Sequence, residues 1–291
     1  MRRATLVLAI AASLLLAACI PAEPDDDLIV EYDPVETVMG EIQERGELRV
    51  GIPVRREPFG RFTSDFGQLV ADALGVETRF KGLAPDELLT APDEGSVDIS
   101  FPLVTITEKL VRRFAFTDPI YIAHQRLLVE RGSSIEQVGD LGGTICQFIT
   151  REVHKLGKAE FALRPVGVNV KTLNPGVVVV EPSETRDCIQ DLRRGRVEAI
   201  TAADWLLVPA LAQSDGLRVV GDDLTTEAYG AVVQSEASAW SDFVNGVLTE
   251  AGAEGDWQQF YDAAFGAYVE EPATYPDMTI EEAAALFPSD L

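Results

Sequence analysis

The stretch VTITEKLVRRFAFTDPIY, residues 104–121, sets the pattern from which the fold can be inferred. It follows VDISFPL, residues 97–103, a β-rich run that predicts a strand. Within it, TEKLVRRF has charges at helical spacing and Thr107 as its expected N-cap, and a second apolar run then leads to Asp-Pro and Tyr121. Strand and helix signals in such close succession favour an α/β protein.

The same alternation extends in both directions along the chain. Predicted strands lie at 47–52, 76–80, 125–131, 142–149, 177–181, 197–204 and 229–235. Predicted helices lie at 36–46, 64–75, 85–95, 151–159, 183–195, 238–252 and 256–266. The helix at 64–75 has a clear signal, because it opens on Ser64 as a cap, closes on Gly75 and repeats apolar residues at helical spacing.

The chain is long and acidic. Its 291 residues suit two domains, and a hydrophobic content of 46% supports a sizeable core. Lys and Arg number 24 against 48 Asp and Glu, which gives a formal net charge of −24. Such a surface repels phosphate backbones and anionic lipid headgroups, so nucleic acid is not an expected partner, and solubility is the simplest role of the charge.

The N-terminus carries an export signal. Arg2 and Arg3 precede the apolar run LVLAIAASLLLAA, which is too short to span a bilayer and suits the core of a signal peptide. The run ends in Leu-Ala-Ala-Cys, which resembles a bacterial lipobox and implies a signal peptide over 1–18 and a lipid anchor on Cys19. An ordinary secretory signal with an incidental Cys19 is the alternative. The acidic residues 19–44 are expected to form a tether.

Two further cysteines, Cys146 and Cys188, remain after export. In an oxidising compartment an even pair favours a disulfide, and two free buried thiols are the alternative. Zinc-type Cys and His spacings are absent, and His124 and His154 are the only histidines, so the sequence predicts neither a metal centre nor a cofactor. GxSxG, HExxH and phosphate-loop motifs are also absent, so we expect no catalytic residues.

Several ordered motifs together resemble those of family 3 extracellular solute-binding proteins, the amino-acid-binding lipoproteins of ABC importers. GELRVGI resembles the opening strand of the family, and GSVDISFPLVTITEK followed by FAFTDPIY its most specific stretch. DLGGTICQ, GRVEAITAAD and EAYGAVV match the second lobe and the return strand. The W-x-x-x-Y-x-x-x-F-G run that ends at Gly266 matches the closing helix. The paired cysteines resemble a glutamate-binding subgroup with a disulfide at the corresponding places.

The resemblance implies an α/β protein of the periplasmic-binding-protein type II fold, with two lobes joined by two crossover strands and closing over a small solute. On this sequence, lobe 1 comprises residues 45–123 and 229–291, and lobe 2 comprises residues 124–228. The resemblance also implies an extracytoplasmic location at the cell membrane and an ABC permease as partner. We expect a monomer.

Both anchors for an amino-acid ligand are altered relative to the family. An arginine six residues into the TIT motif normally grips the α-carboxylate through its planar fork, and here that place is Leu110. Arg112 and Arg113 would point in other directions around the helix axis than Leu110, so neither is a simple substitute for the arginine. The simpler explanation is that both lie on a solvated face of the helix. The family's ammonium-binding aspartate falls on Ala203, with Asp204 one residue later. Asp204 either points to the other face of the strand or reaches the cleft through a turn at the strand end.

Two positions in the first lobe keep the binding character of the family. Thr105 corresponds to a hydroxyl-bearing ligand contact, although it also suits an ordinary strand or cap. Phe59 corresponds to an aromatic residue that covers the bound side chain, although it also suits the core.

Three further residues are expected to attract a negatively charged group of the ligand. Thr150 and Arg151 stand where the family has Gly-Thr at a helix N-terminus, and backbone amides with a cation there suit a carboxylate. A structural cap with a surface arginine is the alternative. Arg56, in a cluster with Arg55 and Arg61, is a candidate to supply the missing positive charge.

These features predict a binding lipoprotein of an ABC importer, which closes around an amino acid or a related small polar or anionic solute. A ligand sensor or scaffold lipoprotein is the main alternative. An enzyme is a third possibility, because this fold is known to host a dehydratase, and it requires Glu152 or Asp204 to act as a general acid or base.

Overall fold

The structure, a computed structural model, describes residues 37–54, 57–148, 153–156, 159–162, 167–181, 185–268 and 273–287. Side chains are not described at 85–86, 153–156, 159–162 and 185–186. The expected signal peptide, Cys19 and most of the tether lie outside the described residues. No described helix combines the length and apolar character that a bilayer crossing requires.

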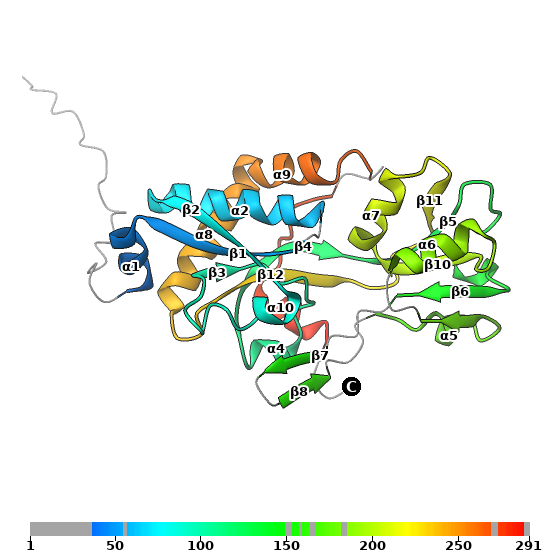
Figure 1. The fold of residues 1–291 in the computed structure, drawn as a ribbon, viewed down its shortest axis with the longest axis horizontal. Helices are drawn as coiled ribbons and strands as arrows, with labels where there is room; N and C mark the ends of the chain where they lie inside the picture. The colour runs from blue at the N-terminus through cyan, green and yellow to red at the C-terminus, as the bar shows by residue number, and fades with distance from the viewer. Residues whose placement is uncertain are drawn as a thin grey trace, which may run out of the picture. The chain divides into compact units, whose positions relative to one another are not determined.

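The first lobe is built on a five-stranded sheet with the strand order β2-β1-β3-β12-β4 (Figure 1). Its strands are β1 (Glu47–Pro53), β2 (Glu77–Leu83), β3 (Ile99–Ser100), β4 (Ala115–Ala123) and β12 (Glu227–Val233). β1 is parallel to β2 and β3, whereas β12 is antiparallel to β3 and β4. β12 is buried along its whole length because it has a strand on each edge and cover on both faces.

The second lobe has its own five-stranded sheet, in the order β11-β5-β10-β6-β9. Its strands are β5 (Gln125–Glu130), β6 (Thr144–Gln147), β9 (Val178–Val180), β10 (Ala199–Ala203) and β11 (Leu217–Val220). β6 is parallel to β9 and β10, and β5 is antiparallel to β10 and β11.

The chain passes between the two sheets twice. β4 ends at Ala123 in the first sheet and β5 begins at Gln125 in the second. On the return, β11 ends at Val220 and β12 begins at Glu227 in the first sheet. This confirms the predicted α/β fold of two lobes with two crossovers. The predicted residue limits of the lobes stay a prediction.

Helices accompany both sheets. The first lobe carries α1 (Val38–Arg45), α2 (Phe59–Leu74), α3 (Pro85–Leu88), α4 (Glu108–Val111), α8 (Ser238–Glu254), α9 (Asp256–Ala264) and α10 (Ile280–Ala285). The second carries the 3-10 turn η1 (Val138–Asp140), α5 (Val170–Leu173), α6 (Thr185–Arg193) and α7 (Asp204–Ala212). Helices α2, α8 and α9 pack on one another, and α2 and α8 also contact strands of the first sheet (Figure 1).

Two buried tryptophans join these helices to the first sheet. The Trp240 indole in α8 donates to the Asp98 carbonyl at 3.0 Å, and the Trp257 indole in α9 donates to the Ile120 carbonyl at 2.7 Å. Each indole therefore buries a large apolar area and still satisfies its one polar group.

The predicted start of the helix at Ser64 is wrong. Helix α2 begins at Phe59, directly after Pro58, and ends at Gly75 with φ 70°. The Ser64 hydroxyl donates to the Gly60 carbonyl at 2.7 Å, a bond that serine can make inside a helix, so its presence does not mark a start. The earlier start matters for the site, because it makes Phe59 the first residue of α2.

The predicted helix at 151–159 is also wrong. Strands β7 (Val153–Leu156) and β8 (Ala159–Ala162) form an antiparallel pair, with His154 opposite Phe161. A nine-residue helix forms few backbone hydrogen bonds, and these do not outweigh the cost of helix nucleation. Pairing of β7 with β8 gives the backbone groups hydrogen-bond partners instead.

The predicted disulfide is present between Cys146 and Cys188, with an S–S distance of 2.03 Å. It joins β6 to α6 across a sequence separation of 42 residues, and both cysteines are buried. The structure therefore confirms the predicted disulfide and not the alternative of two free thiols.

Replacing both cysteines, as Cys146→Ser with Cys188→Ser, should lower the free energy of unfolding by about 3–4 kcal/mol, because the open chain regains the entropy of a loop of this length. Urea unfolding of the native chain and the variant measures the loss. As a control, a reductant should destabilise the native chain and leave the double variant unchanged. Equal stability of the two chains would contradict the expectation.

Candidate ligand-binding site

The register of β12 against β4 builds the candidate site. Glu227 lies opposite Ala123, and Tyr229 lies opposite Tyr121. Side chains two apart on a strand share a face, and directly opposed residues share it too, so Glu227, Tyr229 and Tyr121 lie on one face where the chain leaves the first sheet. Phe59 at the start of α2, Thr105 before α4, and Asp204 with Trp205 at the start of α7 contact these residues. We call these seven residues the crossover cluster.

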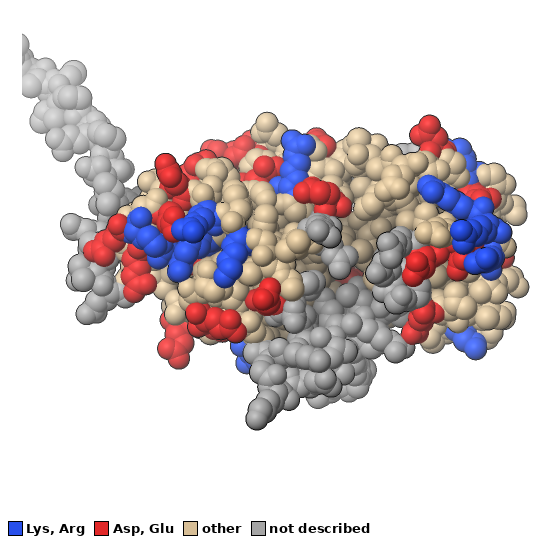
Figure 2. Space-filling model, in the orientation of Figure 1, with Lys and Arg blue, Asp and Glu red and all other residues tan. Residues whose placement is uncertain are grey.

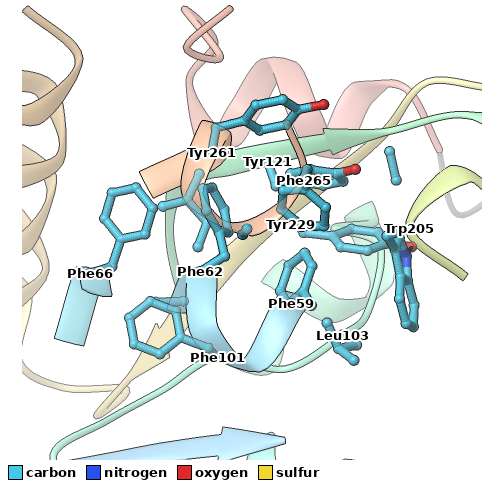
Figure 3. Packing of buried hydrophobic residues seen from close by; sticks show 14 of the residues in the cluster. Phe59, Phe62, Phe66, Phe101, Leu103, Tyr121, Trp205, Tyr229, Tyr261 and Phe265 are labelled. Atoms are coloured by element: carbon cyan, nitrogen blue, oxygen red, sulfur yellow. Dashed lines mark hydrogen bonds between the residues drawn. The ribbon is translucent and has the colours of Figure 1, made fainter. Parts of the chain in front are cut away.

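Four aromatic rings make up the apolar part of the crossover cluster (Figure 3). The Phe59 ring lies 5.3 Å from the Tyr121 ring, 5.8 Å from the Trp205 ring and 6.1 Å from the Tyr229 ring, measured between centroids. The Trp205 indole N–H donates to the Tyr229 hydroxyl at 3.2 Å. Phe59 is only 1% exposed, so in this conformation it behaves as a core residue that borders the polar groups.

Glu227 is a buried carboxylate, 5% exposed. Its oxygens accept from the hydroxyls of Thr225 at 2.8 Å, Thr105 at 3.1 Å and Tyr229 at 3.3 Å. Thr105 reaches it because the N–H of the next residue, Ile106, donates to the Ala228 carbonyl. Burial raises the pKa of Glu227, and the three hydroxyl donors oppose that shift.

Asp204 reaches the same region through the turn from β10 into α7. β10 ends at Ala203 and α7 begins at Asp204, so the side chain is not held to the strand alternation. Its carboxylate accepts from the Tyr121 hydroxyl at 3.1 Å, from the His124 N–H at 3.1 Å and from the Trp205 N–H at 2.6 Å. Burial raises the pKa of Asp204 to about 6, while His124 and these donors hold it lower than burial alone would. Binding of a ligand by Asp204 stays a prediction.

The charge around the crossover cluster is negative. Among the described residues, no arginine or lysine forms an ion pair with Asp204 or Glu227. The nearest cationic candidate is His124, whose Nδ1 lies 2.8 Å from the Thr225 carbonyl and 3.4 Å from Asp223. Arg126 pairs with Asp223 at 2.7 Å. Figure 2 shows one group of basic side chains at the left of the drawn face, one at the right and a further one near the top, with acidic side chains scattered among them.

Leu110 lies in an apolar cluster and is 3% exposed. Its neighbours in the cluster include Ala283 and Ala284 of α10, a helix that the sequence did not predict. The N–H of Glu108 donates to the Phe287 carbonyl at 3.2 Å, which fixes the end of the C-terminal segment beside α4. The position where the sequence analysis expects the family's arginine therefore packs against α10.

The two arginines that follow Leu110 do not replace the family's arginine. Arg112 is exposed and paired with Glu108 one helical turn earlier. Arg113 is exposed and lies over the ring of Phe114, 5.8 Å from its centroid. Both fit the expectation of a solvated helix face.

Several predicted site residues lie outside the described residues. These are Arg56, Thr150 and Arg151, together with Arg55 and Glu152. Arg61, the remaining member of the predicted arginine cluster, is exposed. The structure brings together Phe59, Thr105 and Asp204, which the sequence predicted as site residues.

The sequence analysis missed Tyr121, Trp205, Glu227 and Tyr229 as site residues. Glu227 and Tyr229 stand in the quoted EAYGAVV run, and Trp205 follows Asp204 directly, so the motifs located them without giving a role. Among the described residues, no group of three His, Cys, Asp or Glu side chains is placed to hold a metal ion. The arrangement can bind and orient a small polar molecule through carboxylates, hydroxyls and ring faces.

The fold and the position of this cluster define a two-lobed solute-binding protein. The profile of the bacterial extracellular solute-binding proteins, family 3, matches residues 57–267. The chain belongs to this family.

Curated relatives agree with this assignment. The L-cystine-binding protein TcyJ of Escherichia coli (strain K12) is 28% identical over 254 residues, which span 80% of this chain and 88% of that protein. The glutamate-binding protein GluB of Corynebacterium efficiens is 25% identical over 269 residues, spanning 87% of this chain and 86% of that protein.

Solved structures of amino-acid-binding proteins are also similar to this chain. A mutant of the arginine-binding protein ArgBP from T. maritima is 25% identical, with a TM-score of 0.57, over 79% of this chain and 100% of that one. An ancestral amino-acid-binding protein, a precursor of cyclohexadienyl dehydratase, is 23% identical with a TM-score of 0.59, over 79% of this chain and 100% of that one, and supports the fold alone. The curated relatives are binding proteins rather than enzymes.

Leu110→Arg should lower the free energy of unfolding by at least about 3 kcal/mol, because it buries an unpaired charge under α10, and it should not create amino-acid binding. Leu110→Met is the matched control and should cost less than about 1.5 kcal/mol. Thermal or urea unfolding measures both. A stable Leu110→Arg chain that gains glutamate or arginine binding would show that this position still faces the ligand.

The raised pKa of Asp204 predicts a pH-dependent stability. A carboxyl group whose pKa rises from 3.8 unfolded to about 6 folded contributes stability that is complete below about pH 4 and is lost as the pH rises through 6. Between about pH 4 and pH 7 this loss should be about 2 kcal/mol. Other acidic groups titrate in the same range, so the measurement is the difference between the native chain and Asp204→Asn across the pH series. Parallel curves for the two chains would contradict it.

Proposed function

We propose that this protein is the extracytoplasmic receptor of an ABC importer, which binds an amino acid or a related small polar solute and presents it to a membrane permease. Export and lipidation at Cys19 hold it at the outer face of the cell membrane in this proposal, and it acts as a monomer. Support comes from the family, whose curated relatives include proteins named for binding cystine and glutamate. ArgBP, an arginine-binding protein, supports the same class of solute.

The observation that carries the proposal is that residues of both lobes meet in one polar cluster. Asp204 and Trp205 come from α7 of the second lobe, and they contact Tyr121, Tyr229 and Phe59 of the first. A solute bound among them touches both lobes, so binding and lobe closure stabilise each other. Transport and sensing use this same coupling, and finding genes for a permease and an ATPase beside this one would separate transport from sensing.

The mature chain should show a rise in melting temperature of about 5–10 °C with one solute at a hundredfold excess over its Kd, because a ligand that binds only the folded state adds about 2.7 kcal/mol. The screen covers the proteinogenic amino acids, small organic acids and small amines, and small-angle scattering checks for a reduced radius with the hit. Glu227→Ala is the control chain, which should lose the response. A panel that changes neither the melting temperature nor the radius would contradict the receptor function.

A further inference from the structure

We infer that His124 is a positioning residue of the hinge: its ring fastens the first crossover to the second, and its charged form is the counterion of Asp204 and Glu227. The first crossover is the link between β4 and β5, where His124 lies, and the second is the link between β11 and β12, residues 221–226. The inference goes beyond the proposed receptor function, because it concerns how the two lobes are joined and is tested without a solute.

The first step is the contact that the His124 ring makes with the second crossover. Its Nδ1 lies 2.8 Å from the Thr225 carbonyl oxygen. A carbonyl oxygen only accepts hydrogen bonds, so Nδ1 carries a proton and donates it in both the neutral and the charged ring. The same nitrogen lies 3.4 Å from a carboxylate oxygen of Asp223. The ring of one crossover is therefore bonded to the backbone of the other.

Neighbouring residues make further bonds between the crossovers. The Gln125 N–H donates to the Thr225 hydroxyl at 2.9 Å, and the Leu224 N–H donates to the Gln125 carbonyl at 2.9 Å. Arg126 pairs with Asp223 at 2.7 Å. Because these two links carry the chain between the sheets, bonds that join them make the links bend together as one hinge.

The second step is the path of hydrogen bonds from His124 to both carboxylates of the crossover cluster. The His124 N–H donates to the Asp204 carboxylate at 3.1 Å, and its carbonyl accepts from the Asp204 N–H at 2.8 Å. Thr225, whose carbonyl accepts from the ring, donates its hydroxyl to Glu227 at 2.8 Å. Asp204 begins α7 in the second lobe and Glu227 begins β12 in the first. His124 thus positions one carboxylate of each lobe relative to the hinge.

The third step is the charge of the ring. The described charged groups around it are the carboxylates of Asp204, Asp223 and Glu227 and the guanidinium of Arg126, which pairs with Asp223. Burial raises the pKa of Asp204 and of Glu227, and the positive charge of His124 opposes this rise in both. The ring itself is 28% exposed, so it can exchange a proton with water while its bond to the second crossover is kept.

Two substitutions at this position separate the bond from the charge. His124→Asn keeps an N–H donor in the place of Nδ1 and carries no charge, whereas His124→Ala has neither the donor nor the charge. Arg79→Asn is the matched control, because it removes an exposed cation from β2, at the opposite edge of the first sheet from β4.

Hydrogen exchange followed by NMR measures the fastening, at the amides of Gln125 and Leu224 that bond across the crossovers. In His124→Ala these amides should exchange about fivefold faster than in the native chain, because a net hydrogen bond is lost. In His124→Asn and in Arg79→Asn the rates should change by less than about twofold. Unchanged rates in His124→Ala, or equal acceleration in the alanine and asparagine variants, would overturn the role of the ring bond.

Carboxyl-carbon NMR measures the effect of the charge, with Asp204→Asn used to assign the signal. The pKa of Asp204, about 6 in the native chain, should rise by at least about half a pH unit in both His124→Asn and His124→Ala. It should stay the same in Arg79→Asn, because solvent and salt screen an exposed charge on another part of the sheet. The asparagine variant should therefore restore the exchange rates and not the pKa. An unchanged pKa in both His124 variants would rule out the counterion role.

A measurement at the native His124 keeps the inference testable where a variant at this position fails to fold. His154→Gln leaves His124 as the only histidine, so its signals need no further assignment. Nitrogen NMR at about pH 9, far above the usual pKa of histidine, should find the ring proton on Nδ1. A proton on Nε2 instead would contradict the bond to Thr225. Because none of these measurements uses a solute, failure of this inference and failure of the receptor function are separate results.

Discussion

The pairing of β12 with β4 is the interaction on which the rest of the structure depends. These two strands carry the chain out of the first sheet and back into it, and their register places Tyr229 opposite Tyr121 with Glu227 on the same face. A shift of the register by one residue would turn these side chains to the other face of the sheet. Backbone pairing thus positions the site before any ligand contact is made.

The crossover cluster combines features that lower stability with features that suit binding. Buried carboxylates with raised pKa values weaken a folded chain at neutral pH, and among the described residues Asp204 and Glu227 are two such groups that border the same aromatic rings. Such groups are kept where a partner of opposite charge completes them. The core of the first lobe is largely apolar, with Trp240 and Trp257 satisfied by backbone carbonyls, and its other buried carboxylate, Asp98, is paired with Arg45 and Arg49.

The sequence predicted more of the fold than of the candidate site. Periodicity and caps gave the α/β class and the order of most elements, because these signals are local. Ordered short motifs gave the family and placed Phe59, Thr105 and Asp204 in one region. The export signal and an even cysteine pair predicted the bond between Cys146 and Cys188. The hairpin of β7 and β8 was missed, because its strands form through pairing with each other rather than through local propensity.

The sequence by itself determined the fold class and the family, and it predicted that Leu110 stands where the family has an arginine. Only the tertiary structure decided what surrounds Leu110, which packs with Ala283 and Ala284 of α10, a helix more than 160 residues further along the chain. It also decided that Glu227, Tyr229 and Trp205 belong to the site. The physical reason is that burial and hydrogen bonding depend on neighbours brought together from distant segments, and no local pattern encodes which of the carboxylates will be buried.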